Sequence, residues 1–279
     1  MATENDSDTF DIGGELTVHR LGFGAMRVTG PDVIGSPDDE ENAREVLQHA
    51  VDLGVDFVDT ADSYGPGVSE RLIRESGIAE DAVVATKAGL LRNATGDWIP
   101  HGDPDYIKNQ ALASLDRLGV DSIDLYQYHR PDPDTDFEDA VHAFAELKDD
   151  GLVDHVGLSN VSVEQLETAR DIVDIATVQN AYNVVDREYE DVLEACEDYD
   201  IGFIPYFPMG GGDLGEQQDD LEAVAADHDA TVRQVALAWL LDHSPVTLPI
   251  PGTSSIDHLE TNVAASHLDL TAEDRARLE

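Results

Sequence analysis

Short apolar segments alternate with longer amphipathic segments along most of the chain. The apolar segments are rich in Val, Ile, Phe and Tyr and have the length of buried β-strands, whereas the segments between them repeat their apolar residues with the spacing of helices. Eight strand-like segments occur, at residues 21–26, 56–59, 83–87, 123–129, 155–159, 177–180, 202–205 and 247–249. Strands that alternate with helices in this way predict a parallel sheet.

The amphipathic segments complete eight strand–helix pairs. They lie at residues 40–53, 68–76, 104–118, 137–150, 163–172, 188–199, 221–241 and 256–265. Eight pairs in 279 residues predict an α/β fold, a closed (β/α)8 TIM barrel that spans residues 1–279 as one domain, because such barrels take roughly 250 residues. Gly13 and Gly14 separate two short β-like segments ahead of the first strand, which predicts an N-terminal β-hairpin across the barrel bottom.

Polar residues lie at the ends of the predicted strands. Asp59, Lys87 and His129 end the second, third and fourth strands, and polar residues also close the next three. In a closed barrel these ends meet at one mouth, whereas an open sheet spreads them along an edge. We therefore expect one active site at the mouth.

The net charge of the chain restricts the partners and the surroundings that suit the protein. It has 60 Asp and Glu against 16 Lys and Arg, a formal net charge of −44, which excludes nucleic acid and anionic membranes as partners. An acidic surface with few lysines is typical of halophilic proteins. The single Cys196, the absence of a signal-peptide pattern and the absence of an apolar run of ~18 residues predict a cytoplasmic protein. The oligomeric state stays open.

Four side chains at the predicted mouth suit proton transfer to a carbonyl oxygen. A tyrosine has an ordinary pKa of ~10, so Tyr64 gives up a proton near neutral pH only if a cation stabilises its phenolate. Lys87 is the candidate cation, Asp59 would keep it charged and oriented, and His129 would hydrogen-bond the substrate oxygen. Each residue taken alone also has an ordinary structural interpretation. A lysine inside a buried strand is unusual in a chain with so few lysines, and it favours the interpretation that the four residues form one catalytic group.

Four stretches of the chain resemble the aldo-keto reductase family. They are FVDTADSYG at residues 57–65, ATKAG at 85–89, DLYQYHRPDP at 124–133 and IPGTSS at 250–255. The resemblance places the family's catalytic Asp, Tyr, Lys and His on Asp59, Tyr64, Lys87 and His129. It implies a (β/α)8 barrel that uses NADP(H), without a metal, to interconvert small carbonyl compounds and alcohols. Within the family, the chain looks most like the microbial pyridoxal reductases.

The same resemblance implies how the cofactor binds. Ser159, Asn160 and Gln179 match residues that hydrogen-bond the nicotinamide carboxamide, and Tyr206 matches the aromatic residue that stacks on the nicotinamide ring. Other matches belong to the loop over the pyrophosphate and to the adenosine-phosphate end. These residues are Phe207, Pro208, Met209, Gly210, Ile250, Gly252, Thr253, Ser254, His258 and Asn262.

The chain departs from the family pattern at the adenosine 2′-phosphate. Gly252 and His258 stand where many relatives have a lysine and an arginine that bind this phosphate. Hydroxyl groups and backbone amides at the start of the following helix can still bind it. We therefore expect NADP(H) to bind, with NAD(H) as a second accepted cofactor.

Other sequence features raise interpretations different from an oxidoreductase. Residues 210–215, GGGDLG, match a dinucleotide-binding pattern, but the segment 231–241 that follows is helical, so a flexible loop fits better. A metal-dependent barrel hydrolase would need several His, Asp and Glu ligands at strand ends, and among ten histidines only His129 qualifies. A regulatory module that binds the cofactor with little turnover stays open.

Overall fold

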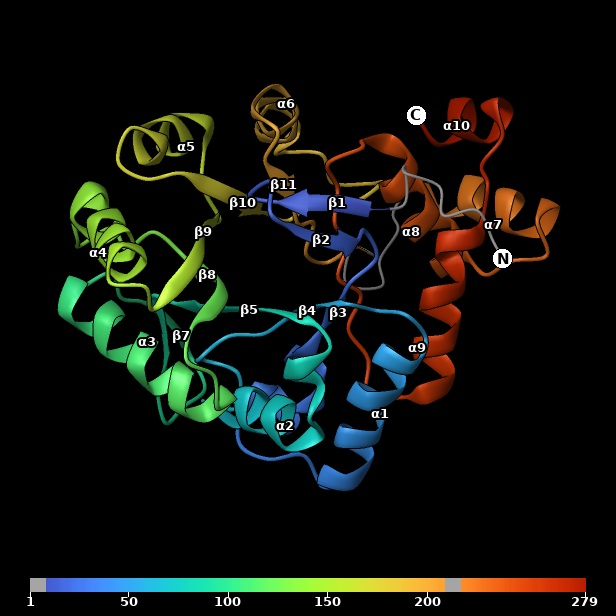
Figure 1. The fold of residues 1–279 in the computed structure, drawn as a ribbon. Helices are drawn as coiled ribbons and strands as arrows, with labels where there is room; N and C mark the ends of the chain where they lie inside the picture. Colours follow the sequence, from blue (N-terminus) through green and yellow to red (C-terminus); the bar gives the residue numbers. More distant parts are fainter. Residues whose placement is uncertain (1–8, 209–216) are drawn as a thin grey trace.

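The computed structural model describes residues 9–208 and 217–279. At its centre lies a parallel sheet of seven strands in the order β11-β10-β9-β8-β5-β4-β3, which curls into a ring surrounded by helices (Figure 1). The strands are β3 (Phe23–Gly24), β4 (Phe57–Asp59), β5 (Val83–Ala88), β8 (Ile123–Tyr128), β9 (Val153–Ser159), β10 (Ile175–Gln179) and β11 (Gly202–Phe203).

The extended segment 246–251 joins the two edges of this sheet. On one side, the backbone N–H of Leu248 donates to the carbonyl oxygen of Phe203 at 2.7 Å, and on the other the N–H of Gly22 donates to the carbonyl oxygen of Pro249 at 3.0 Å. The segment therefore serves as the eighth strand and confirms the predicted (β/α)8 barrel. Its two prolines lack an N–H to donate, which explains why it pairs irregularly.

The predicted N-terminal hairpin covers the bottom of the barrel. β1 (Thr9–Ile12) pairs antiparallel with β2 (Leu16–His19), and the turn between them holds Gly13 and Gly14 at φ of +61° and +74°, a conformation that favours glycine. Ile12 and Val18 of the hairpin are fully buried. They pack in one apolar cluster with strand residues of the barrel interior, including Phe57, so the hairpin closes this end of the core.

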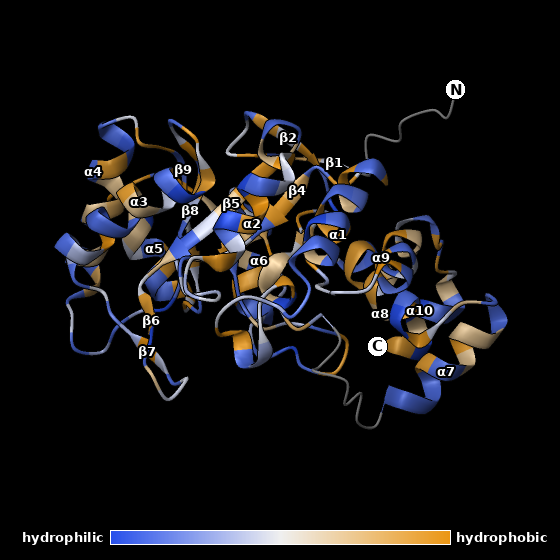
Figure 2. Ribbon diagram, turned by 90° about the horizontal axis from the view of Figure 1, so that it is seen from below, coloured by the Kyte–Doolittle hydropathy of each residue, from blue (hydrophilic) through white to orange (hydrophobic). Residues whose placement is uncertain are grey.

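Ten α-helices surround the strands within the described residues, and most begin after a side chain that accepts a backbone N–H, as the first helical turn requires. Their solvent-facing sides are largely hydrophilic (Figure 2). None of the described helices is long and apolar enough to cross a membrane. The helices are α1 (Glu40–Asp52), α2 (Val68–Ser76), α3 (Pro104–Leu118), α4 (Phe137–Asp149), α5 (Val163–Arg170), α6 (Glu190–Tyr199), α7 (Gln218–Asp227), α8 (Val232–His243), α9 (Ile256–Val263) and α10 (Ala272–Leu278).

Three parts of the fold differ from the prediction. The single helix expected at 221–241 is wrong, because α7 and α8 are separated by a break where Asp229 has a φ of +51° and Thr231 forms a capping box with Gln234. A second hairpin, β6 (Leu90–Arg92) with β7 (Trp98–Pro100), was not expected, and neither was α10. Figure 2 shows the β6–β7 hairpin projecting beyond the strands of the barrel.

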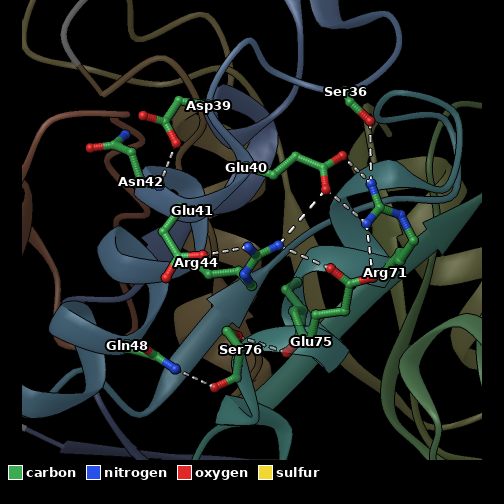
Figure 3. A network of polar contacts seen from close by, with 11 residues as sticks. Ser36, Asp39, Glu40, Glu41, Asn42, Arg44, Gln48, Arg71, Glu75 and Ser76 are labelled. Atoms are coloured by element: carbon green, nitrogen blue, oxygen red, sulfur yellow. Dashed lines mark hydrogen bonds and ion pairs between the residues drawn. The ribbon is translucent and has the colours of Figure 1, made fainter.

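Arginine side chains bridge the acidic surfaces of α1 and α2. Arg71 donates to Glu40 at 2.6 Å and to Glu75 at 2.8 Å, and Arg44 donates to Glu41 and to Glu75 (Figure 3). The Arg71 hydrogen bond lowers the pKa of the Glu40 carboxyl to about 2. Isolated surface ion pairs contribute little, but this network lets two acidic helices pack side by side.

Candidate active site

The strands place polar side chains inside the barrel because alternate residues of a strand point to the same side. Phe57 and Ala85 belong to the apolar cluster of the interior, and so do their neighbours on adjacent strands. Asp59 and Lys87 each follow two positions later and therefore point inward as well, one layer closer to the mouth. The same two-residue step from Leu125 makes Gln127 an inward-facing residue.

A buried ion pair occupies the centre of this layer. The Lys87 Nζ donates to Asp59 Oδ1 at 2.6 Å and to the carbonyl oxygen of Thr60 at 2.7 Å, and the lysine is fully buried. Gln127 and Gln179 donate to the other carboxylate oxygen of Asp59, at 3.1 Å and 2.9 Å. Burial lowers the pKa of Lys87, while the adjacent Asp59 carboxylate opposes that change. The pair is thus fixed in position by several hydrogen bonds.

Tyr64 and His129 lie next to this pair. The Lys87 Nζ is 5.4 Å from the centre of the Tyr64 ring, and the rings of Tyr64 and His129 are 5.9 Å apart and nearly perpendicular. Burial, reinforced by the nearby Asp59 carboxylate, raises the pKa of the Tyr64 phenol well above its ordinary value, so the phenol stays protonated. Burial, with the charges of Lys87 and Arg130, holds the pKa of His129 well below its ordinary value. The structure therefore brings all four predicted residues together.

Sequence reasoning missed three residues that contact this group. Gln127 was overlooked, although its position two residues after Leu125 points to the interior. Ser63 Oγ lies 3.4 Å from His129 Nδ1. The Trp98 ring lies 6.3 Å from the Tyr64 ring and 6.5 Å from the His129 ring, and it comes from the unexpected β6–β7 hairpin.

A second buried carboxyl group lies beside the site and was also missed. Asp62 is almost fully buried, accepts a hydrogen bond from the Tyr106 hydroxyl at 3.2 Å, and has one oxygen without a partner. Burial, reinforced by the neighbouring Glu70 carboxylate, raises the pKa of Asp62 to about 8. Glu70 itself accepts hydrogen bonds from Thr86 and Arg117. Asp62 is therefore protonated near neutral pH.

The residues expected to bind the nicotinamide form one hydrogen-bonded group. Asn160 donates to the carbonyl oxygen of His129 at 2.9 Å and to Ser159 Oγ at 3.0 Å, and it accepts a bond from the Tyr206 hydroxyl at 2.6 Å. Asn160 has a φ of +60°, in the left-handed region that asparagine adopts more readily than most residues with a side chain. Gln179 contacts the catalytic group through Asp59.

The residues expected at the rest of the cofactor are spread over two segments. Phe207 is half exposed and packs against Tyr206, and Pro208 follows it, whereas Met209, Gly210 and the remainder of the glycine-rich segment lie outside the described residues. The other residues follow the eighth strand: Ile250 and Thr253 are buried, Gly252 is half-buried, Ser254 and His258 are exposed, and Asn262 is buried in α9.

The described residues contain no group of three or more His, Cys, Asp and Glu side chains arranged to hold a metal ion.

Comparison with known proteins gives the same picture over almost the whole chain. A family model described as the aldo/keto reductase family matches residues 20–279. The chain is 45% identical over 267 residues to an uncharacterised oxidoreductase of Schizosaccharomyces pombe, covering 95% of this chain and 87% of that protein. It is 40% identical over 276 residues to pyridoxine 4-dehydrogenase of Escherichia coli, covering 96% of each.

A solved structure has the same fold. The aldo/keto reductase from Klebsiella pneumoniae, determined in complex with NADP and acetate, superposes with a TM-score of 0.82 at 26% sequence identity and covers 97% of this chain and 94% of that one.

Proposed function

Because the chain belongs to the aldo/keto reductase family, a family of oxidoreductases, we propose that it transfers a hydride between NADP(H) and a small aldehyde or ketone, or the corresponding alcohol. In this proposal Tyr64 is the proton donor. The observation that carries it is the buried group of Tyr64, His129 and the Lys87–Asp59 pair at the mouth of the barrel.

The residues of the adenosine end fit a nucleotide. Both polar atoms of the Asn262 side chain are buried and have no hydrogen-bond partner. An unpaired buried amide is costly, and the edge of a nucleobase offers one donor and one acceptor that would satisfy it. Thr253 and Ser254 precede α9, whose first backbone amides favour a phosphate. The NADP complex of the Klebsiella relative supports the same choice of cofactor.

When bound, the reduced cofactor supplies the hydride, and this chain's own side chains would handle the proton and the substrate oxygen. A carbonyl oxygen between Tyr64 and His129 would accept one hydrogen bond from each, which aligns and polarises it. His129 suits this role as a neutral donor because its pKa is held low. Tyr64 suits proton donation because its phenol stays protonated until charge develops on the substrate.

Lys87 would stabilise the phenolate that remains after Tyr64 gives up its proton. The ammonium group lies 5.4 Å from the Tyr64 ring in a buried setting, where charges interact more strongly than in water. Asp59, itself held by Gln127 and Gln179, keeps the ammonium in place. Cycling between the neutral phenol and the phenolate is thus coupled to a fixed cation.

The choice of substrate rests on relatives. One of the matched relatives is named for a pyridoxine dehydrogenase activity, so pyridoxal and pyridoxine are the first substrates to assay here, followed by simple aldehydes and ketoses.

The test compares the wild-type protein with Tyr64→Phe. We expect the wild type to oxidise NADPH when an aldehyde is added, and the variant to lose at least about a hundredfold in kcat while binding NADPH with unchanged affinity, because only the proton donor is removed. NADPH affinity is measured by fluorescence titration. Turnover by the variant within about tenfold of the wild type would contradict the role of Tyr64. NADPH binding by the wild type with no turnover of any carbonyl compound would favour the regulatory-module alternative.

A further inference from the structure

Three aromatic rings form a corner at the mouth of the barrel. The ring centres of Tyr64, His129 and Trp98 are 5.9, 6.3 and 6.5 Å apart, and each pair of rings is steeply inclined. Tyr64 and His129 are only 7% and 8% exposed, whereas Trp98 is 40% exposed. A molecule that reaches the first two rings from solvent therefore lies against the third.

We propose that Trp98 is a specificity-determining residue that selects carbonyl compounds with a flat ring beside the carbonyl group, and that Arg92 is the positioning residue that holds Trp98 in place. This inference rests on the proposed function, because it takes Tyr64 and His129 as the groups that bind the carbonyl oxygen. It adds to that function the class of substrate and the residues that select it.

Arg92 supports the Trp98 ring from one side. The guanidinium carbon lies 3.7 Å from the centre of the indole, which is the geometry of a stacked cation–π contact. The same guanidinium donates to the carbonyl oxygens of Asp32 at 2.8 Å, Val33 at 3.1 Å and Gly96 at 2.8 Å. Arg92 thus ties the β6–β7 hairpin to the loop that follows β3, and its guanidinium holds one side of the Trp98 ring.

The backbone of that loop indicates that the contacts of Arg92 are a fixed feature of the fold. Asp32 and Val33 have φ values of +55° and +60°, and such values are strained for a residue with a side chain, above all for a β-branched one. Strain of this kind persists only where neighbouring contacts hold the backbone. The two carbonyl groups of the strained residues are the ones that Arg92 binds.

One face of the indole is covered by Arg92, so a substrate meets the surface that remains. A planar ring stacks on such a surface over its whole area, whereas a puckered ring of the same size touches it at few points. A carbonyl group attached directly to the planar ring would then reach Tyr64 and His129 without bending away from Trp98. The corner therefore favours an aromatic aldehyde over a saturated cyclic aldehyde.

The first experiment measures kcat/KM for benzaldehyde and for cyclohexanecarboxaldehyde, which have equal numbers of carbon atoms. The ratio of the two values removes effects on cofactor binding and on chemistry common to both. We expect Trp98→Ala to lower the preference for benzaldehyde by about three- to tenfold, the usual size of an aromatic stacking contribution, mainly through KM. Trp98→Phe should retain most of the preference, and Ile99→Ala, on the same hairpin and similarly exposed, should leave it unchanged.

Arg92→Met tests the positioning role. It should lower the same preference as Trp98→Ala does while the affinity for NADPH stays unchanged, because the tryptophan is present but no longer held. Thermal unfolding of every variant checks that the fold is intact. A Trp98→Ala protein that still turns over both aldehydes with the wild-type ratio would overturn the proposal.

The second experiment does not depend on turnover. Benzamide and cyclohexanecarboxamide carry an unreactive carbonyl group on the same two rings, and their affinities for the NADP⁺-loaded protein are measured by calorimetry. We expect benzamide to bind more tightly to the wild type and the difference to vanish in Trp98→Ala. Discrimination between the amides in a wild-type protein that reduces no aldehyde would sustain this inference while refuting the proposed function. Equal binding of the two amides by wild type and variant would overturn the inference alone.

Discussion

Replacing Asp62 with asparagine should remove a pH dependence from the stability of the protein. In the folded protein the pKa of Asp62 is raised from 3.8 to about 8, chiefly by burial, with Glu70 adding repulsion and Tyr106 and Arg117 opposing it. Between these two values the folded chain holds a proton that the unfolded chain has lost. Stability from this group is therefore complete below about pH 4 and is lost as the pH rises through about 8.

The magnitude follows from proton linkage. Each pH unit between the two pKa values costs about 1.4 kcal/mol, so the interval from about pH 5 to about pH 8 sets an upper limit of about 4 kcal/mol. Local relaxation and water entry reduce effects of burial, and we expect about 2 to 4 kcal/mol. Asparagine has nearly the shape of the protonated carboxyl group but cannot ionise. The variant should therefore gain stability relative to the wild type by this amount over the interval.

The assay is urea unfolding of wild type and variant at a series of pH values, with the difference between them plotted against pH. Glu40→Gln is the matched control. Its carboxyl has a pKa lowered to about 2, mainly by the hydrogen bond from Arg71, and no histidine contacts it, so it is ionised in both folded and unfolded chains above about pH 6 and its difference curve should be flat there. A difference curve for Asp62→Asn that is as flat as the control would refute the reasoning.

Three further predictions concern charge. Lys87→Met and Asp59→Asn should each destabilise the fold by about 3 to 5 kcal/mol in urea unfolding, because each single change leaves a buried polar partner behind. The double variant should therefore be destabilised by less than the sum of the two, and strictly additive values would contradict a coupled pair. The thermal midpoint should rise with added potassium chloride, since salt screens a net charge of −44, and a flat profile would count against the predicted halophilic adaptation. His258→Arg should increase the ratio of kcat/KM for NADPH to kcat/KM for NADH by about tenfold, the contribution expected of one exposed charge-assisted hydrogen bond. An unchanged ratio would show that this position lies away from the 2′-phosphate.

The parts of the fold that sequence reasoning predicted correctly are those set by local periodicity. Strands such as β5 and β8 are almost entirely buried and rich in apolar residues. The polar residues Lys87 and His129, next to their ends, could be singled out because those ends converge in a barrel. The break between α7 and α8 had a readable signal in the capping pair Thr231 and Gln234, but the apolar pattern on either side concealed it. The β6–β7 hairpin had no such signal, since its strands have three residues each and carry exposed residues such as Trp98.

Properties that depend on distant segments could not be predicted from the pattern. Asp62 looks like an ordinary loop residue, and its high pKa arises only because the fold buries it and brings the Glu70 carboxylate of α2 close to it. The cation–π contact of Arg92 with Trp98 is local in sequence, yet the carbonyl groups that fix Arg92 belong to a loop about sixty residues away. Such contacts form only in the folded barrel, so the local sequence pattern does not reveal them.

The acidity of the chain bears directly on how it could hold an anionic cofactor. At the adenosine end Gly252 and His258 offer no permanent positive charge, and the net charge of −44 repels phosphate at long range. Short-range attraction comes from the hydroxyls of Thr253 and Ser254, from the amides that begin α9, and from Arg27, whose side chain lies beside Gly252 and lines the same pocket as Ser254. Salt does not weaken hydrogen bonds from neutral donors to a phosphate, whereas it screens the attraction between the phosphate and a lysine or arginine.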